Sequence, residues 1–140
     1  MKQFMQTHKV YLTPLSPIHI GCGEDFEPTN YVIDGTTLFN FEPSQLVLNE
    51  REKTELVNAI NRLDLLAIQR FFLNQKDKAI ACSYHFADVS EGLAQDYKNS
   101  VGKVAQRESD GNKVINNLSI ERTAFLPVQH LPYIPGSGFK

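Results

Sequence analysis

The chain has 140 residues, with 14 Lys and Arg against 16 Asp and Glu, and this length is enough for one domain with a buried core. Hydrophobic residues make up 41% and charged residues 21%, which excludes a disordered or collagen-like chain. No transmembrane segment and no signal peptide can be recognised, so the sequence predicts a cytoplasmic protein without a membrane partner. In that reducing compartment Cys22 and Cys82 are expected to remain thiols.

The net charge of −2 is unevenly distributed along the chain. Residues 1–23 carry +2, residues 24–96 carry −7 and residues 97–140 carry +3. Domains that bind nucleic acid usually have a basic excess, so the total charge argues against such a partner. Two basic ends can nevertheless give a globally acidic protein a local positive surface. Chance variation in surface charge explains the pattern equally well.

The first predicted elements are extended. The segment from Phe4 to Pro14 alternates, with Val10 and Leu12 on one face, and predicts a half-buried strand. Prolines and glycines follow, so residues 16–25 are expected to form a loop. Residues 30–33 and 36–41 then flank Asp34 and Gly35, a pair typical of the type I′ turn of a β-hairpin.

After residue 42 the hydrophobic period becomes helical. Asn49 and Glu52 have the spacing of a capping box, and apolar residues then recur every three or four positions. Asp64 can cap a second helix that runs through Phe72 and ends near Asn74. The pattern therefore predicts a helical hairpin within residues 43–74.

The second half of the chain gives weaker signals. Residues 78–86 are compatible with a strand or a further helix, residues 108–112 predict a turn or mobile loop, and residues 116–126 look extended. The glycine-rich segment Pro135–Lys140 would normally lead into a helix. We therefore expect the chain to be a fragment or a truncated product of something longer.

Two glycine loops carry the candidate chemistry. Pro135–Lys140 (PGSGFK) offers closely spaced backbone N–H groups, a hydroxyl and a lysine, which suit a phosphate oxygen. Its spacing is not that of a Walker A loop, and Gly21–Phe26 (GCGEDF) lacks the third glycine of a dinucleotide fingerprint. Each loop alone is more often a tight turn than a ligand site.

Together, three segments resemble a known family. They are LTPLSPIHIGCGE at residues 12–24, YVID at residues 31–34 with its hairpin to residues 38–39, and PYIPGSGFK at residues 132–140. In this order they resemble RAMP-superfamily CRISPR-associated proteins, most closely the fifth Csm subunit of type III-A effector complexes. Gly138 stands where serine is commoner in the family, and the chain stops before the family's following Gly and Arg.

The resemblance implies an α+β fold, a truncated ferredoxin-like (RRM-like) RAMP domain over residues 1–140, with a mainly helical insertion at about 43–112. It implies a non-catalytic subunit that binds the guide RNA (crRNA) near its 3′ end, takes part in crRNA maturation and complex assembly, and contacts neighbouring RAMP backbone subunits. No cofactor is implied. The RNA-binding positions that it implies are His19, Gly21, Gly23, Gly136, Ser137, Gly138 and Lys140.

Four alternatives stay open. His19 could act as a general acid or base in a metal-independent, guide-processing ribonuclease, although a lone loop histidine is more often structural. Cys22 between two glycines could be a nucleophile, but no base is identifiable beside it. The pairs His19/Cys22 and Cys82/His85 form a candidate zinc set, since two Cys and two His suit tetrahedral zinc. The fourth alternative is an acidic protein-interaction module without RNA contact.

Overall fold

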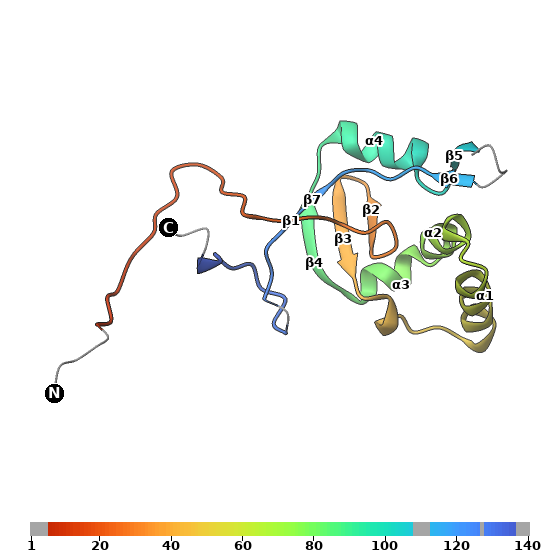
Figure 1. Ribbon diagram of the computed structural model, residues 1–140, viewed down its shortest axis with the longest axis horizontal. Coiled ribbons are helices and arrows are strands. Elements are labelled where there is room, and N and C mark those ends of the chain that lie inside the picture. The colour runs from red at the N-terminus through yellow and green to blue at the C-terminus, as the bar shows by residue number, and fades with distance from the viewer. Residues whose placement is uncertain (1–5, 108–112, 127, 137–140) are drawn as a thin grey trace.

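The computed structural model describes residues 6–107, 113–126 and 128–136. Within these ranges the chain is a mixed α+β protein with three small antiparallel sheets and four α-helices (Figure 1). The sheets pair β1 with β7, β2 with β3 and β4, and β5 with β6. The strands are β1 (Gly21–Asp25), β2 (Tyr31–Asp34), β3 (Thr37–Phe41), β4 (Ser83–Asp88), β5 (Val104–Arg107), β6 (Lys113–Ile115) and β7 (Glu121–Thr123).

The predicted hairpin is confirmed, with a different turn. Asp34 pairs with Thr37, so the two central residues are Gly35 and Thr36 rather than Asp34 and Gly35. Gly35 has φ +59°, and Thr36 is not among the residues with positive φ. Positive φ at the first central position alone is the signature of a type II′ turn, whereas type I′ needs it at both. The hairpin prediction is confirmed, but its central pair and turn type are wrong, because the turn lies one residue later.

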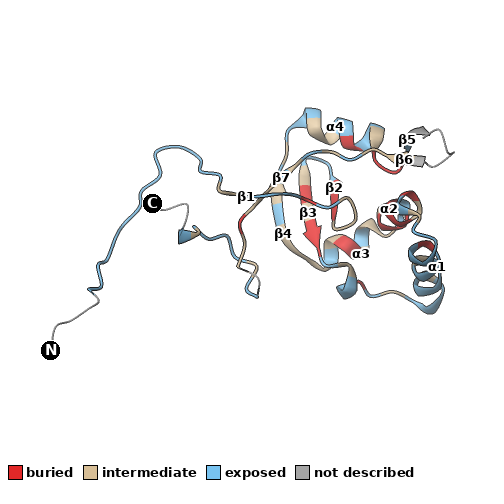
Figure 2. Cartoon of the chain, in the orientation of Figure 1, coloured by how far each residue is buried: buried red, intermediate tan, exposed pale blue. Residues whose placement is uncertain are grey.

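Strands β2 and β3 of the central sheet are buried on both faces. Val32 and Phe41 join a cluster with the helices on one side, while Tyr31, Ile33 and Leu38 join a second cluster on the other side. Adjacent strand residues therefore point to opposite cores, as the two-residue period requires. Figure 2 shows β2 and β3 among the buried parts of the molecule, while β4 is intermediate or exposed.

The helical hairpin predicted for residues 43–74 is present. Asn49 and Glu52 form the capping box, because each side chain accepts a hydrogen bond from the other residue's backbone N–H, at 2.9 and 2.8 Å. Asp64 accepts from the Ala67 N–H at 3.0 Å and starts the second helix. The four helices are α1 (Glu50–Asn61), α2 (Leu65–Asn74), α3 (Lys76–Ala81) and α4 (Glu91–Ser100), preceded by the 3-10 helix η1 (Pro43–Gln45).

The ambiguous stretch at residues 78–86 contains both of its predicted structures. It completes α3 and then enters β4, whose pairing with β3 makes it part of the central sheet. Residues 43–112 thus supply a sheet strand as well as helices. The turn predicted at residues 108–112 lies outside the described residues.

A polar clamp fastens the end of α4 to α2. Gln69, which is buried, accepts a hydrogen bond from the Gly102 N–H at 2.8 Å, and Arg70 donates to the Gly102 carbonyl at 2.7 Å. Gly102 has φ +77°, and a Cβ added there would lie 2.6 Å from the Leu73 Cδ1 atom. Glycine is required here by both conformation and space.

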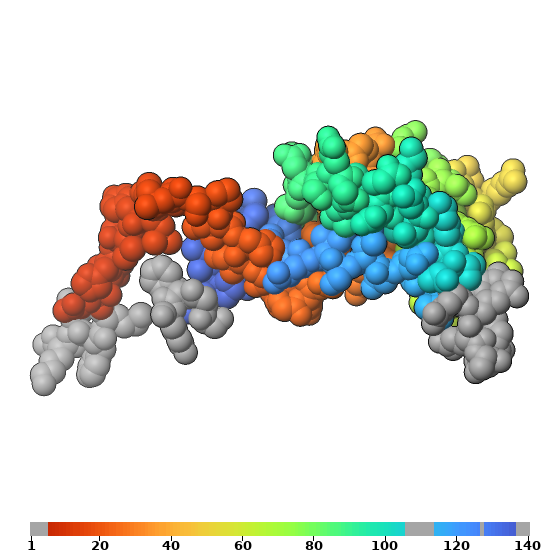
Figure 3. All heavy atoms as spheres, turned by 90° about the horizontal axis from the view of Figure 1, so that it is seen from above, coloured from red at the N-terminus to blue at the C-terminus, as the bar shows by residue number. Residues whose placement is uncertain are grey.

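The N-terminal prediction is wrong in two respects. Residues 6–14, expected to continue a half-buried strand from Phe4, are exposed and form no strand, and Val10 and Leu12 are 63% and 60% exposed. Residues 21–25, expected to be loop, form β1 instead. The cause is pairing: β1 meets β7, about a hundred residues away, whereas residues 6–14 meet no partner strand among the described residues. Figures 1 and 3 show residues 6–20 extending away from the body.

Candidate functional site

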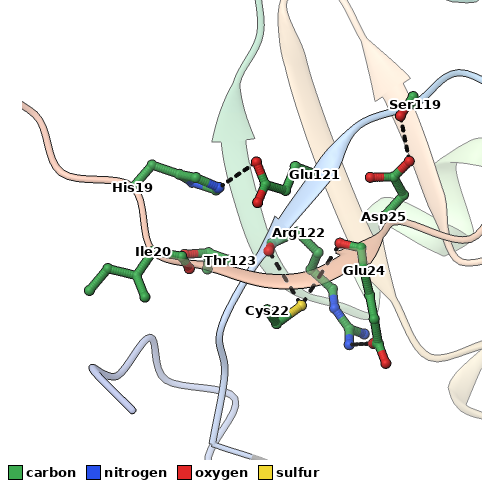
Figure 4. Close-up of polar contacts among 9 residues, drawn as sticks. All are labelled: His19, Ile20, Cys22, Glu24, Asp25, Ser119, Glu121, Arg122 and Thr123. Carbon is green, nitrogen blue, oxygen red and sulfur yellow. Dashed lines mark hydrogen bonds and ion pairs between the residues drawn. The ribbon is translucent and has the colours of Figure 1, made fainter. Parts of the chain in front are cut away.

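The β1–β7 ribbon brings the two motif segments together. The Ala124 N–H donates to the Ile20 carbonyl at 2.9 Å, and the Ala124 carbonyl accepts from the Tyr133 N–H at 3.1 Å. The Thr123 hydroxyl also donates to the Ile20 carbonyl, at 3.0 Å (Figure 4). A hollow of about 160 Å³ lies between the segments, lined by Ile18, Ile20, Thr123, Pro132, Tyr133 and Ile134. Residues far apart in sequence therefore form one surface.

His19 lies between Ile18 and Ile20, and its side chain points toward Glu121 (Figure 4). Its Nε2 atom is 3.5 Å from Glu121 Oε2, and both side chains are more than half exposed. The Glu121 carboxylate also occupies the space where a Gly21 side chain would lie. Because this carboxylate ends a flexible side chain, it could rotate away from a larger residue at position 21. Because both side chains are solvated, His19 lacks the water-excluded surroundings that favour acid–base catalysis.

Cys22 and Arg122 make the central contacts of the ribbon. The Cys22 thiol donates to the Arg122 carbonyl at 3.4 Å and lies 3.8 Å from the Glu24 carbonyl oxygen. The Arg122 guanidinium forms an ion pair with Glu24 (Figure 4). Interaction with the Cys22 side chain, followed by the charge of Glu24, raises the pKa of Arg122 above its ordinary value. Arg122 Nε is buried and has no hydrogen-bond partner among the described residues.

The predicted glycine positions behave differently from one another. Gly23 has φ +77° with open space around it, and lies between Gly21 and Asp25 where the β1–β7 register shifts. Gly136 is exposed, and an added Cβ would contact nothing within 4 Å. Neither glycine is required by packing, so their surroundings leave room for a ligand. The predicted sites Ser137, Gly138 and Lys140 lie outside the described residues.

The zinc set is not assembled. His85 lies against Phe26 and Phe125, with ring centroids 6.5 and 4.5 Å away, and burial lowers the pKa of its imidazole. The Cys82 thiol donates to the Ala79 carbonyl at 3.5 Å. In the part of the chain that the structure describes, no three His, Cys, Asp or Glu side chains come together in a way that could hold a metal ion. The described structure therefore does not bring His19, Cys22, Cys82 and His85 together as a ligand set.

A second hollow, which the sequence did not reveal, lies on the other side of β7. We call it the Arg122 pocket; it has a volume of about 310 Å³ and is lined by Cys22, Tyr84, Arg122, Phe125, His130 and Tyr133, with Ala124 and Leu126 between them. The Tyr84 and His130 rings stack with centroids 4.1 Å apart at 28°. Because its residues come from β1, β4, β7 and the chain after β7, no residue spacing within a short sequence segment predicts this pocket.

Comparison with known proteins does not identify a family for this chain. No protein family, curated protein or solved structure shows significant similarity to this chain. The likeness to RAMP proteins therefore depends on the motif residues alone. Among the described helices, none combines the length and apolar character needed to cross a membrane.

Proposed function

We propose that this chain is a non-catalytic guide-RNA-binding subunit of a type III-A CRISPR effector complex, acting in the cytoplasm. In this proposal it binds the crRNA near its 3′ end, supports crRNA maturation and assembly, and contacts neighbouring RAMP subunits. The α+β chain would be part of a ferredoxin-like RAMP domain. The proposal starts from the three motif segments and their order.

The observation that carries the proposal is the meeting of the two motif segments. Residues 18–20 and 132–134 are more than a hundred positions apart, yet both are hydrogen-bonded to Ala124. Two segments can bind one ligand together only if they lie side by side, whereas two unrelated turns need not be close to each other. His19 and Gly136, two of the proposed RNA contacts, are both exposed for a ligand.

The distribution of charge supports RNA binding on the part of the molecule that carries the two motif segments. The acidic excess lies in residues 24–96, which include α1, α2, α3 and the central sheet. Both motif segments lie outside that range or at its border. Phosphates would be repelled by the acidic side and are better accommodated near the ends of the chain. Cross-linking of RNA mainly to α1 and α2 would contradict this orientation.

Binding without cleavage fits the surroundings of His19. Its ionic partner is Glu121 on an open surface, and the pair lacks the water-excluded environment that favours acid–base catalysis. In a cleavage assay with precursor RNA, the chain should leave the RNA intact. Cleavage that disappears in His19→Ala would establish the ribonuclease alternative instead.

The direct test is equilibrium binding to RNA of guide length, measured by gel shift and filter binding over a series of salt concentrations. We expect binding that weakens as salt rises, because phosphate contacts release counterions. A folded chain that binds no RNA at any salt concentration would overturn the proposal and favour a protein-interaction module.

Lys140 provides a sharper version of this test. If its ammonium contacts one phosphate, Lys140→Ala should lower the slope of log affinity against log salt by about 0.7 for single-stranded RNA. Lys53→Ala is the matched control, since Lys53 is an exposed lysine of α1 paired with Glu50. An unchanged slope in Lys140→Ala would remove this residue from the RNA interface.

A further inference from the structure

We propose that the Arg122 pocket binds one unpaired base of single-stranded RNA. This inference rests on the proposed function and adds to it, because the motif loops explain phosphate contacts but leave the pocket unexplained. It requires three properties of the pocket: a size that suits one planar ring, aromatic surfaces to stack on, and a free polar group at the ring's edge.

The size and lining fit a single ring. A volume of about 310 Å³ is at the lower end of the range for small-molecule pockets, so it suits one nucleoside-sized group rather than a longer segment. Four aromatic side chains line the pocket, from Tyr84, Phe125, His130 and Tyr133. Stacking on such side chains is how proteins hold unpaired bases.

His130 is held in place by a restrictive backbone. Its φ is +53°, a left-handed conformation that is uncommon for residues other than glycine. The His130 N–H donates to the Leu126 carbonyl at 2.9 Å, and Phe125 forms a β-bridge with Pro132. These contacts fix the backbone from which the imidazole stacks on Tyr84. Strained backbone of this kind is concentrated at ligand sites.

The polar groups favour a neutral ring over a phosphate. Glu24 already neutralises the Arg122 guanidinium, so a second anion would have to displace it. The Arg122 Nε–H is buried and unpartnered among the described residues, and after a shift of the side chain toward the pocket it can donate to a ring nitrogen or carbonyl oxygen. Burial, as the main cause, raises the pKa of Tyr84, so its phenol stays neutral beside the ligand.

One residue links the pocket to the motif surface. Tyr133 lines both the Arg122 pocket and the hollow between the two motif segments, although the two hollows lie on opposite sides of β7, where Arg122 lines one and Thr123 the other. An RNA strand whose phosphates follow the motif segments could therefore turn one base into the pocket. A phenylalanine or leucine side chain of a protein partner would fill the volume but leave the Nε–H of Arg122 without an acceptor.

The test compares two RNA probes on the 140-residue chain. One is octa-adenylate, and the other is an octamer with the same ribose–phosphate backbone but no bases. We expect the unmodified chain to prefer octa-adenylate by about tenfold at fixed salt, the order of magnitude of one stacked base. His130→Asn, which tolerates the left-handed backbone but removes the ring stack, should bring this ratio close to one.

Arg122→Lys keeps the charge opposite Glu24 but removes the Nε donor, and should lower the same ratio. Neither variant should change the affinity for the abasic octamer. Phe86→Leu is the matched control, because Phe86 is an exposed aromatic residue of β4 outside the pocket. It should retain the tenfold preference, and circular dichroism should show that all variants fold.

The outcomes separate this inference from the proposed function. Equal affinity for the two probes, or an unchanged ratio in both pocket variants, would overturn the base site while leaving the RNA-binding subunit intact. Failure to bind either probe would overturn both proposals. If the His130 ring resonances shift with N-acetyltryptophanamide but not with adenosine monophosphate, the pocket belongs to a protein side chain, and the inference is wrong.

Discussion

Apolar side chains are buried in the central body but exposed in the N-terminal arm, residues 6–20. In the body, Phe41 is completely buried and packs on Phe72 with ring centroids 5.3 Å apart. In the arm, Leu15 is 99% exposed, and Val10, Leu12 and Ile18 are more than half exposed (Figure 2). The helices and the central sheet thus form a closed core among themselves, whereas nearly all side chains of the arm remain exposed to solvent. Stability and binding should therefore respond to different substitutions.

The strongest test of the comparison is the buried phenylalanine of β3. Phe41→Ala should lower the free energy of unfolding by about 3–5 kcal/mol, because it removes buried area and leaves a cavity. Urea denaturation followed by circular dichroism measures this change. Phe86→Ala on the neighbouring strand is the control, since Phe86 is 71% exposed and its loss should cost far less. Similar losses for the two variants would contradict the proposed core.

Alkaline pH probes the second core cluster. Burial, as the main cause, raises the pKa of Tyr31 to about 12 and also raises that of Tyr97. A raised folded-state pKa means that the unfolded chain loses its phenolic protons first, at about pH 10. Stability should therefore be fully present below pH 10 and fall as the pH rises toward 12. The double variant Tyr31→Phe and Tyr97→Phe should lose less stability over this interval, as measured by denaturation at each pH. A variant with the same pH dependence as the parent chain would disprove this origin.

Gly102 tests the clamp between α2 and α4. Gly102→Ala should destabilise the chain by about 1–2 kcal/mol through its left-handed backbone, with an added cost from the contact with Leu73. Gly35→Ala is the matched control, because Gly35 also has positive φ but open space around it. Thermal denaturation of both variants isolates the steric part. A smaller loss at Gly102 than at Gly35 would show that the clamp adapts.

The smallest effect on folding is expected in the arm. Replacing Leu12 and Leu15 together by Ser should change the free energy of unfolding by less than about 0.5 kcal/mol, because both side chains are already exposed. Chemical denaturation provides the measurement. A loss as large as that of Phe41→Ala would mean that the arm packs on the body in solution and would remove the contrast between the two regions.

Local signals were predictable from the sequence. The capping box of Asn49 and Glu52, the Asp64 cap and the β2–β3 hairpin each depend on residues within a few positions of one another, and all three were found. The hairpin turn was misplaced by one residue because Asp34 still belongs to the strand ladder. Short-range chemistry is sufficient for such elements.

Long-range pairing explains the rest. The alternating pattern in the arm is compatible with a strand, but a strand also needs a partner strand to pair with. Despite its glycines, β1 pairs with residues 121–123. The Arg122 pocket was missed for the same reason, since Tyr84 is dozens of residues away from Arg122 and His130 and the three form no motif.

The β1–β7 pairing also has a consequence for the order in which the chain folds. Gly21 pairs with Thr123, and every helix and the whole central sheet lie between them. At a synthesis rate of 5–20 residues per second, β1 leaves the ribosome about 5–20 seconds before its partner exists. The body can complete its local contacts during this delay, while the edge of β1 waits as an open template for other strands. The ribbon that carries the candidate site is thus the last part to form, and a nascent chain halted before residue 121 would have a folded body without the site.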